Sequence, residues 1–396
     1  MKHIKGYEVQ PQNYKQKRDP AIELMRIVGC LCVIACHINP GPLKHGVAYN
    51  SQIFITCLVA DGVAIFWFIT GCFLFREDFN YQRSLSHFAK KIGIPVCVFC
   101  LFIFFFYDFF ISGTPILKSL SHPLSDYKAL VYSLAKLLVP VKRSGHLWFL
   151  IAYFLLLLIS PALNSFALYL RKSDKRENVF LALSFIGLTI NTLTNNQTFA
   201  FSHHSLNAMI PGAIIVLWGD IFYRRWNNIK LRLASHQLLI ALVALTGIVC
   251  VNNIRAIFQH HAYMQGLDHT VAIFWYSPFG LLVTICIYIL CKSLIQKDTH
   301  PKLKFIICTV ASLTFPVYVI HEFIIDMLNS NGIIPFIKSH LLHGMSGFWT
   351  LSFILCTATS IFLVSLAICG VLSKLSGILT IKIKHSRFFS QPHQQV

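Results

Sequence analysis

The sequence contains little charge. Only 12% of the 396 residues are Asp, Glu, Lys or Arg, and 55% are hydrophobic, whereas about a quarter of the residues in a soluble domain are charged. This composition excludes an ordinary water-soluble protein. Instead, apolar stretches of about 20 residues, the helical length that crosses the roughly 30 Å hydrocarbon core of a bilayer, recur from end to end.

Other patterns are missing as well. The 13 cysteines lie almost wholly within apolar segments, where a thiol behaves as a small hydrophobic side chain, and no predicted loop contains a cysteine pair. Disulfide frameworks and zinc sites are indicated by cysteines or histidines at short, regular spacings, so neither a disulfide nor a metal site is expected. There is no internal repeat and no low-complexity segment, which favours one membrane domain.

The apolar stretches predict an all-α fold, a polytopic integral membrane helix bundle with about ten transmembrane helices. We expect a tail over 1–20, a transmembrane domain over 21–375 and a second tail over 376–396. Because the first span is followed by further ones, we interpret it as a membrane anchor and not as a cleaved signal peptide. The predicted spans lie near residues 21–41, 52–75, 92–112, 147–167, 179–193, 207–222, 235–252, 271–291, 305–328 and 347–373.

Acidic residues are scarce relative to basic ones, 15 against 34, which gives a formal net charge of +19. In a soluble protein this excess would suggest a nucleic-acid partner. Most Lys and Arg residues, however, lie in the two tails and in the even-numbered connections between predicted spans. The positive-inside rule then places both termini in the cytoplasm and the connections over 113–146 and 194–206 outside. No nucleic acid is needed to explain the charge.

The first predicted span contains three ionisable residues. Such a side chain inside a membrane helix costs about 2.5–3.5 kcal/mol on insertion scales and marks a functional position. The spacing of Arg26 and His37 places them on one helix face, about 16 Å apart along the axis. Glu23 precedes Arg26 by one turn and is placed to pair with it. We interpret His37, toward the outer surface, as a group that takes or gives a proton near neutral pH.

Further polar residues interrupt the other spans. His321 lies at a depth similar to that of the histidine in the first span, and His146 opens the fourth span from the outer side. The alternative for each is an interfacial or helix-packing role. Asp61, in the second span, is either a counter-ion or a group that orients a catalytic residue. Lys90 and Lys91 begin the third span and are explained most simply as charges that set the topology.

Four ordered motifs resemble those of the bacterial acyltransferase 3 family. Arg26 and His37 match its R-x10-H motif. The segment FWFITGCFL (66–74) is similar to its FF-x-x-SG-x-L segment, with threonine in place of the usual serine. HLWFL (146–150) resembles the family's run at the start of a helix, and PVYVIHEF (316–323) resembles its Y-x-x-H stretch. Together the four motifs span most of the chain.

The resemblance implies a multi-pass enzyme of the bacterial plasma (inner) membrane that O-acylates glycans. Its acyl donor would be cytoplasmic acyl-CoA, most often acetyl-CoA, and its acceptor a hydroxyl of a cell-surface or lipid-linked glycan, with polysaccharide-assembly proteins as further partners. The family often has a spaced basic pair at the third span, whereas Lys90 and Lys91 are adjacent. No secreted hydrolase-like domain is recognised, so the membrane domain would complete the transfer or hand the acyl group to a partner.

The resemblance and the depth pattern together predict roles for the site residues. His37 would act as general base on the acceptor hydroxyl or would carry the acyl group covalently, and both routes stay open. Catalytic roles are expected for His37, Arg26 and His321, CoA binding for Arg26, Lys90 and Lys91, and substrate contact or support for Glu23, Asp61, His146, Trp148 and Tyr318.

Two other classes of protein would also need buried charges. One is a transporter or flippase for a lipid-linked sugar, whose site lies in a central cavity. The sequence shows neither the repeated halves nor the paired Gly/Pro interruptions that are typical of such a site. The other is a non-catalytic membrane scaffold or acyl-sensing protein, and the order of the polar residues along the chain argues against it.

Overall fold

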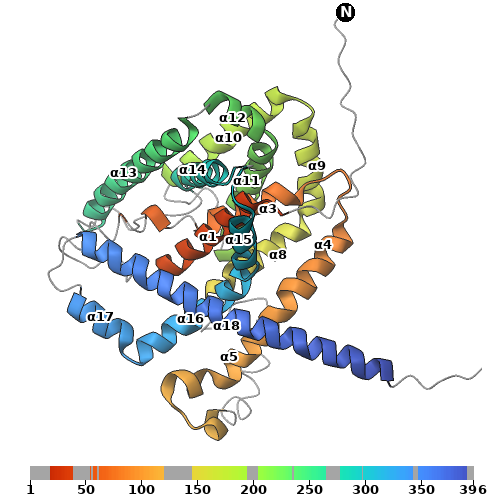
Figure 1. Ribbon diagram of the computed structural model, residues 1–396. Coiled ribbons are helices and arrows are strands. Elements are labelled where there is room, and N and C mark those ends of the chain that lie inside the picture. Colours follow the sequence, from red (N-terminus) through yellow and green to blue (C-terminus); the bar gives the residue numbers. More distant parts are fainter. Residues whose placement is uncertain are drawn as a thin grey trace, which may run out of the picture.

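The fold is a bundle of helices gathered around α1 and α3 (Figure 1). The computed structural model describes residues 18–38, 54, 57–59, 62–119, 145–193, 204–233, 236–264, 277–296, 298–341 and 347–389. Their regular secondary structure is helical without a strand, which confirms the predicted all-α fold. The elements are α1 (Pro20–Ile38), α3 (Gly62–Leu74), α4 (Tyr81–Phe88), η1 (Ala89–Gly93), α5 (Ile94–Ser112), η3 (Gly145–Leu147), α8 (Trp148–Leu158), α9 (Ser160–Arg171), α10 (Asp174–Leu193), α11 (His204–Arg224), α12 (Trp226–Leu233), α13 (Gln237–Met264), α14 (Pro278–Leu294), α15 (Pro301–Ser312), α16 (Thr314–Ser330), α17 (Ile333–Leu341) and α18 (Gly347–Phe389).

Five helical segments within the described residues are long and apolar enough to cross a membrane, and up to seven if each of two bent helix pairs is one span. The five are Pro20–Ile38, Cys57–Leu74, Tyr81–Ser112, Gln237–Ile254 and Leu351–Lys374. The two bent pairs, α8 with α9 and α15 with α16, coincide with the predicted spans at 147–167 and 305–328. The chain is therefore a polytopic membrane protein, while the count of ten and the cytoplasmic termini stay predictions.

Proline explains both bends. α8 and α9 meet at 67°, and α15 and α16 meet at 53°. Pro161 and Pro316 stand just after the two breaks and lack the N–H that a helix donates to the carbonyl four residues earlier. At the first break the Ser160 hydroxyl donates to the Leu157 carbonyl at 2.7 Å, the group that Pro161 leaves without its helical donor. At the second, α16 starts inside the bundle, where Thr314 is buried.

Two glycines let α3 and α11 approach backbone to backbone. A Cβ atom added at Gly71 would lie 1.8 Å from the carbonyl oxygen of Val216, and one added at Gly219 would lie 2.1 Å from that of Phe68. Both distances are far below van der Waals contact, so no larger residue fits without moving a helix. This packing fixes α3, which forms one wall of the site described below.

Three arginines at or just after the ends of α9 and α11 form ion pairs with two buried carboxylates, Glu177 of α10 and Asp220 of α11. Arg171 Nη2 lies 2.7 Å from Asp220 Oδ1, and Arg224 Nη2 lies 2.5 Å from Glu177 Oε1. Arg225 Nη2 is 2.6 Å from Glu177 Oε2. Because an unpaired buried carboxylate is strongly destabilising, these arginines cross-link three helices in addition to any effect on topology.

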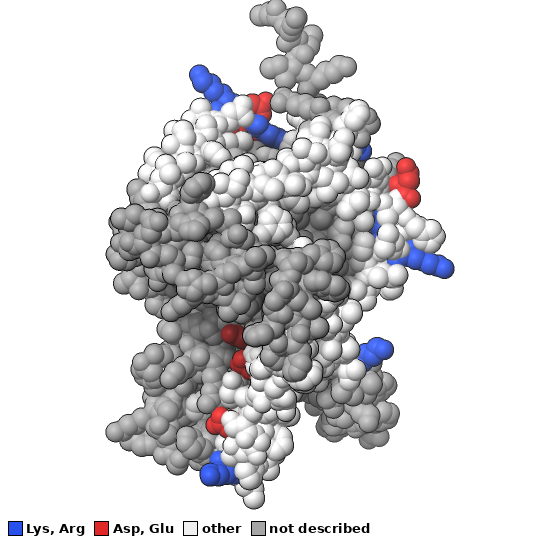
Figure 2. Space-filling model, turned by 90° about the vertical axis from the view of Figure 1, so that its left-hand side faces the viewer, with Lys and Arg blue, Asp and Glu red and all other residues white. Residues whose placement is uncertain are grey.

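The outer surface of the bundle is apolar. Among the described residues on the face in Figure 2, Lys, Arg, Asp and Glu occupy only a few small areas. Large apolar side chains that are more than half exposed occur on α5, α10, α13 and α18, for example Val98, Leu183, Val243 and Leu363. A soluble monomer rarely exposes contiguous apolar patches of more than a few hundred Å². Lipid is the solvent that suits such a surface.

Several predicted segments lie outside the described residues. They include residues 1–17 of the first tail, residues 120–144 and 194–203 of the predicted outer connections, residues 390–396, and Asp61. Residues 376–389 of the predicted second tail continue α18 as one helix. The predicted domain boundaries accordingly stay predictions.

Candidate functional site

The cationic end of the site is an ion pair within α1. Arg26 Nη1 lies 2.9 Å from Glu23 Oε2, one helical turn away, as the spacing of the two residues predicts. Glu23 is only 5% exposed, and its other carboxylate oxygen lies 3.7 Å from Arg18 Nε. The Arg26 guanidinium is therefore held in place by one partner, with further hydrogen-bond donors left for another anionic or carbonyl group.

Three histidines from distant parts of the chain meet at the other end of α1. The ring centroids of His37 and His321 are 5.1 Å apart, those of His146 and His321 are 5.0 Å apart, and those of His37 and His146 are 6.3 Å apart. We call these residues the histidine cluster. The structure thus brings together His37 and His321, whose similar depth was predicted, and His146 from the outer start of the fourth predicted span. His37 is solvent-accessible, whereas His146 and His321 are buried.

The backbone fixes the tautomer of His321. Its Nδ1 lies 2.6 Å from the carbonyl oxygen of Tyr318, and a carbonyl can only accept, so Nδ1 carries the proton of the neutral ring. Nε2 then holds a lone pair. This atom is buried and has no hydrogen-bond partner within the described part of the chain. An unpaired acceptor of this kind, beside His37, is suited to receive a proton or to orient the neighbouring ring.

His146 is tied to α16 by three contacts. Its Nδ1 contacts the carboxylate of Glu322, and its Nε2 lies 3.1 Å from the carbonyl oxygen of Val319. The Tyr318 hydroxyl donates to the His146 carbonyl. Both ring nitrogens therefore lie beside oxygen atoms of α16. His146 is thus held in place where its ring supports the cluster.

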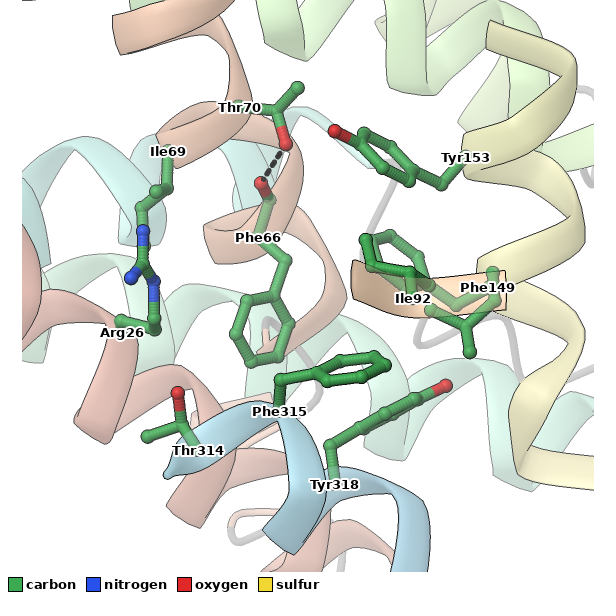
Figure 3. Close-up of a pocket in the computed structure, with 11 residues that line it drawn as sticks. Arg26, Phe66, Ile69, Thr70, Ile92, Phe149, Tyr153, Thr314, Phe315 and Tyr318 are labelled. Carbon is green, nitrogen blue, oxygen red and sulfur yellow. Dashed lines mark hydrogen bonds between the residues drawn. The ribbon is translucent and has the colours of Figure 1, made fainter. Parts of the chain in front are cut away.

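A cavity of about 180 Å³ lies between Arg26 and the histidine cluster. We call it the Arg26 cavity. Figure 3 shows Arg26 on one side of it, Tyr153 and Tyr318 on the other, and phenylalanine rings between them. The Thr70 hydroxyl at its wall donates to the Phe66 carbonyl at 2.9 Å. Its lining residues are Arg26, Phe66, Ile69, Thr70, Ile92, Phe149, Leu150, Tyr153, Thr314, Phe315 and Tyr318.

Tyr318 links the two levels of the site. Its ring lines the Arg26 cavity, its hydroxyl contacts His146, and its carbonyl accepts from His321. The cavity therefore ends against residues that hold the histidine cluster. A mostly apolar cavity that has a cation on one side and contacts the supports of the histidine cluster on the other can accept an uncharged, flexible chain.

The other predicted site residues lie at the edge of this arrangement or outside it. Lys90 and Lys91 are exposed on the π-helix η1 and do not line the Arg26 cavity, although Ile92 in the same turn does. Trp148 opens α8 and packs edge-on against Phe149, with ring centroids 6.3 Å apart. Asp61 lies outside the described residues. No group of three described His, Cys, Asp or Glu side chains has the geometry of a metal site.

Two members of the site were not selected from the sequence. Glu322 directly follows His321, and an acidic residue within a membrane helix is itself a signal of function. Glu322 could therefore have been selected from the sequence. Tyr153 stands among the apolar residues of α8 with no pattern to distinguish it, and only the packing of α8 against α3 and α16 places its ring at the cavity.

Comparison with known proteins adds one finding to this geometry. The model of the acyltransferase 3 family, described as an acyltransferase domain, matches residues 19–373. Neither the curated proteins nor the solved structures that were compared with the chain gave a match. The family match covers most of the chain and includes every residue of the histidine cluster and of the Arg26 cavity. The chain therefore belongs to the acyltransferase 3 family and is a membrane acyltransferase.

Proposed function

We propose that the protein is an O-acyltransferase of the bacterial plasma membrane that transfers an acyl group, most often acetyl, from cytoplasmic acyl-CoA to a hydroxyl of a cell-surface or lipid-linked glycan. The observation that supports this proposal is the Arg26 cavity, which has Arg26 on one side and on the other Tyr318, the residue that contacts His146 and His321. A thioester donor needs such a passage, because its anionic part and its reactive carbonyl lie at opposite ends of a flexible arm.

The distance between Arg26 and His37 decides what each can do. They are about 16 Å apart along α1, so they cannot both contact one thioester carbonyl. We therefore assign Arg26 to holding the acyl donor. The arm of the donor then lies in the Arg26 cavity, which Thr70 and Tyr153 line, and the thioester is presented toward the histidine cluster. The guanidinium offers a planar, bidentate set of N–H groups that suits phosphate or carbonyl oxygen.

Proton transfer falls to the accessible histidine. His37 can take the proton of the acceptor hydroxyl as its oxygen attacks the thioester carbonyl carbon. The carbon–sulfur bond then breaks, and the leaving thiolate takes up a proton to give free CoA. His321, buried beside His37 with an unpaired Nε2, can accept an N–H from His37 and orient its ring. His146 and Glu322 hold this pair in place from the side.

A second route uses the same residues. In it a nitrogen of His37 attacks the thioester carbonyl, CoA leaves as the thiol, and the acceptor hydroxyl then displaces the imidazole from the acyl group. The two routes differ in one observable. Only the second gives an acyl-protein that forms from acyl-CoA in the absence of acceptor, and peptide mass spectrometry would locate it on His37.

The test uses purified protein, radiolabelled acetyl-CoA and glycan released from the surface of the native cells. We expect label to enter the glycan and free thiol to appear in equal amount. A protein that is instead a transporter or flippase would bind or move a lipid-linked sugar and leave acetyl-CoA intact. Intact acetyl-CoA in the presence of a verified acceptor, with protein that is folded by its thermal transition, would therefore contradict the proposal.

A further inference from the structure

A second cavity lies beside the Arg26 cavity, where the end of α3, the turn after it, α4 and the middle of α8 meet. Its volume is about 380 Å³, within the range of about 300–1,000 Å³ that is typical of small-molecule sites. Its polar lining includes Arg76, Asp78, Asn80, Arg83, Ser84 and His87. We call it the α4 cleft. No step of the proposed acyl transfer uses this cleft.

The α4 cleft and the Arg26 cavity share two lining residues, Ile92 and Tyr153. Figure 3 shows both side chains on the wall opposite Arg26. The two spaces are therefore neighbours that meet at these two side chains. A flexible chain that starts in the α4 cleft would reach the Arg26 cavity by passing Tyr153.

The start of α4 prepares the cleft for an anion. Asn80 caps the helix by accepting from the backbone N–H of Arg83 at 2.8 Å, so the orientation of the first turn is fixed. Arg83 and His87 stand four residues apart and share a helix face. Arg76 follows the end of α3 and reaches the same space. The cleft thus gathers two guanidinium groups and an imidazole around one opening.

Arg83 differs from the arginines that serve the packing of the bundle. Arg171, Arg224 and Arg225 are all neutralised by buried carboxylates. The Arg83 guanidinium, in contrast, makes no hydrogen bond or ion pair with any residue that the structure describes. Its charge is available to a ligand. Asp78, also on the lining, would repel a second anion beside it but can accept from a hydroxyl or amino group of a ligand.

We propose that the α4 cleft binds the 3′-phosphorylated ADP portion of the acyl-CoA donor, with Arg83 and Arg76 on the phosphates and Asp78 on a ribose hydroxyl or the adenine amine. This inference rests on the function proposed above. It assigns the nucleotide to residues other than Lys90 and Lys91, which line neither space. The arm of the donor then passes Tyr153 into the Arg26 cavity, and its thioester faces the histidine cluster.

The test compares whole and truncated ligands on purified protein. Binding of tritiated acetyl-CoA is measured, with unlabelled adenosine 3′,5′-bisphosphate or acetyl-pantetheine as competitor. For the wild-type protein we expect both to compete. Arg83→Glu should weaken binding of acetyl-CoA and of the bisphosphate by roughly 10-fold or more, because a charge-assisted contact is replaced by repulsion. Its affinity for acetyl-pantetheine, which lacks the nucleotide, should stay within about 2-fold.

Two further variants control for general effects. Lys175→Glu makes the same change of charge at an exposed residue of α10 and should leave all three affinities unchanged. Arg83→Lys keeps the charge but loses the planar fork, so its affinity for acetyl-CoA should fall between those of the wild type and Arg83→Glu. Unchanged acetyl-CoA binding by Arg83→Glu, or an equal loss for acetyl-pantetheine, would overturn the cleft assignment alone. Absence of acetyl-CoA binding by the folded wild-type protein would overturn the proposed function with it.

Discussion

Replacing Glu322 by glutamine tests whether the carboxylate beside His146 supports the histidine cluster. The change keeps the size of the side chain and one acceptor oxygen, but removes the negative charge beside the His146 ring. The Glu322 side chain is 27% exposed, so solvent screens the contact only in part. A hydrogen bond to a charged group contributes about 1.5–3 kcal/mol. If this contact stabilises the transition state but not the ground state, its loss lowers the rate of acyl transfer roughly 10- to 150-fold.

The matched control is Asp326→Asn, one turn further along α16. Asp326 accepts a hydrogen bond from the Tyr107 hydroxyl at 3.0 Å, and the same acid-to-amide change there leaves the contact between Glu322 and His146 in place. We expect transfer by Asp326→Asn to stay within about 5-fold of the wild type, because the amide oxygen of asparagine can still accept from the Tyr107 hydroxyl. The assay is the initial rate of labelled acetyl transfer at equal amounts of folded protein. Equal rates for Glu322→Gln and Asp326→Asn would refute the reasoning.

Three other predictions concern Arg26, the packing of α3 and the membrane topology. Arg26→Lys should lower transfer at least about 10-fold at normal abundance, because an ammonium cannot reproduce the guanidinium fork; full activity would reduce Arg26 to a structural charge. Gly71→Ala should destabilise the folded protein by about 1–3 kcal/mol or more, seen as a lower thermal midpoint, because its Cβ would clash with the Val216 carbonyl; an unchanged midpoint would contradict the packing. Single cysteines within 113–146, with accessible native thiols removed, should react with impermeant maleimide on intact spheroplasts, whereas labelling only after lysis would invert the predicted topology.

The fold class and the depth of the key residues could be predicted because both depend on local sequence. Hydropathy is set by composition over about 20 residues, and the separation of Arg26 and His37 follows from helix geometry alone. The pairing of Glu23 with Arg26 is likewise local. The approach of His321 to His37 was suggested by their similar depth, since helices that cross one membrane bring residues of equal depth to one level, and His146 was placed on the same outer side.

The rest depends on how the helices pack. The bends at Pro161 and Pro316 could have been suspected from proline chemistry, but their angles depend on the neighbours of each helix. Tyr153 lines the Arg26 cavity only because α8 lies against α3 and α16. In the sequence nothing distinguishes Arg83 from other exposed arginines, and only the structure shows that it lines the α4 cleft. Tertiary contacts of this kind leave no periodic signal in one sequence.

The most direct test of the account is the activity of His37→Asn in cells. Asparagine keeps one hydrogen-bonding group of the imidazole but cannot move a proton near neutral pH. Acetyl content of the surface glycan is measured by mass spectrometry or proton NMR in a deletion strain complemented with wild type, His37→Asn or His321→Asn at matched abundance. We predict a loss of about 10²-fold or more for His37→Asn, the size of a general-base contribution, and a smaller loss for His321→Asn. Normal acetylation by His37→Asn would contradict the account.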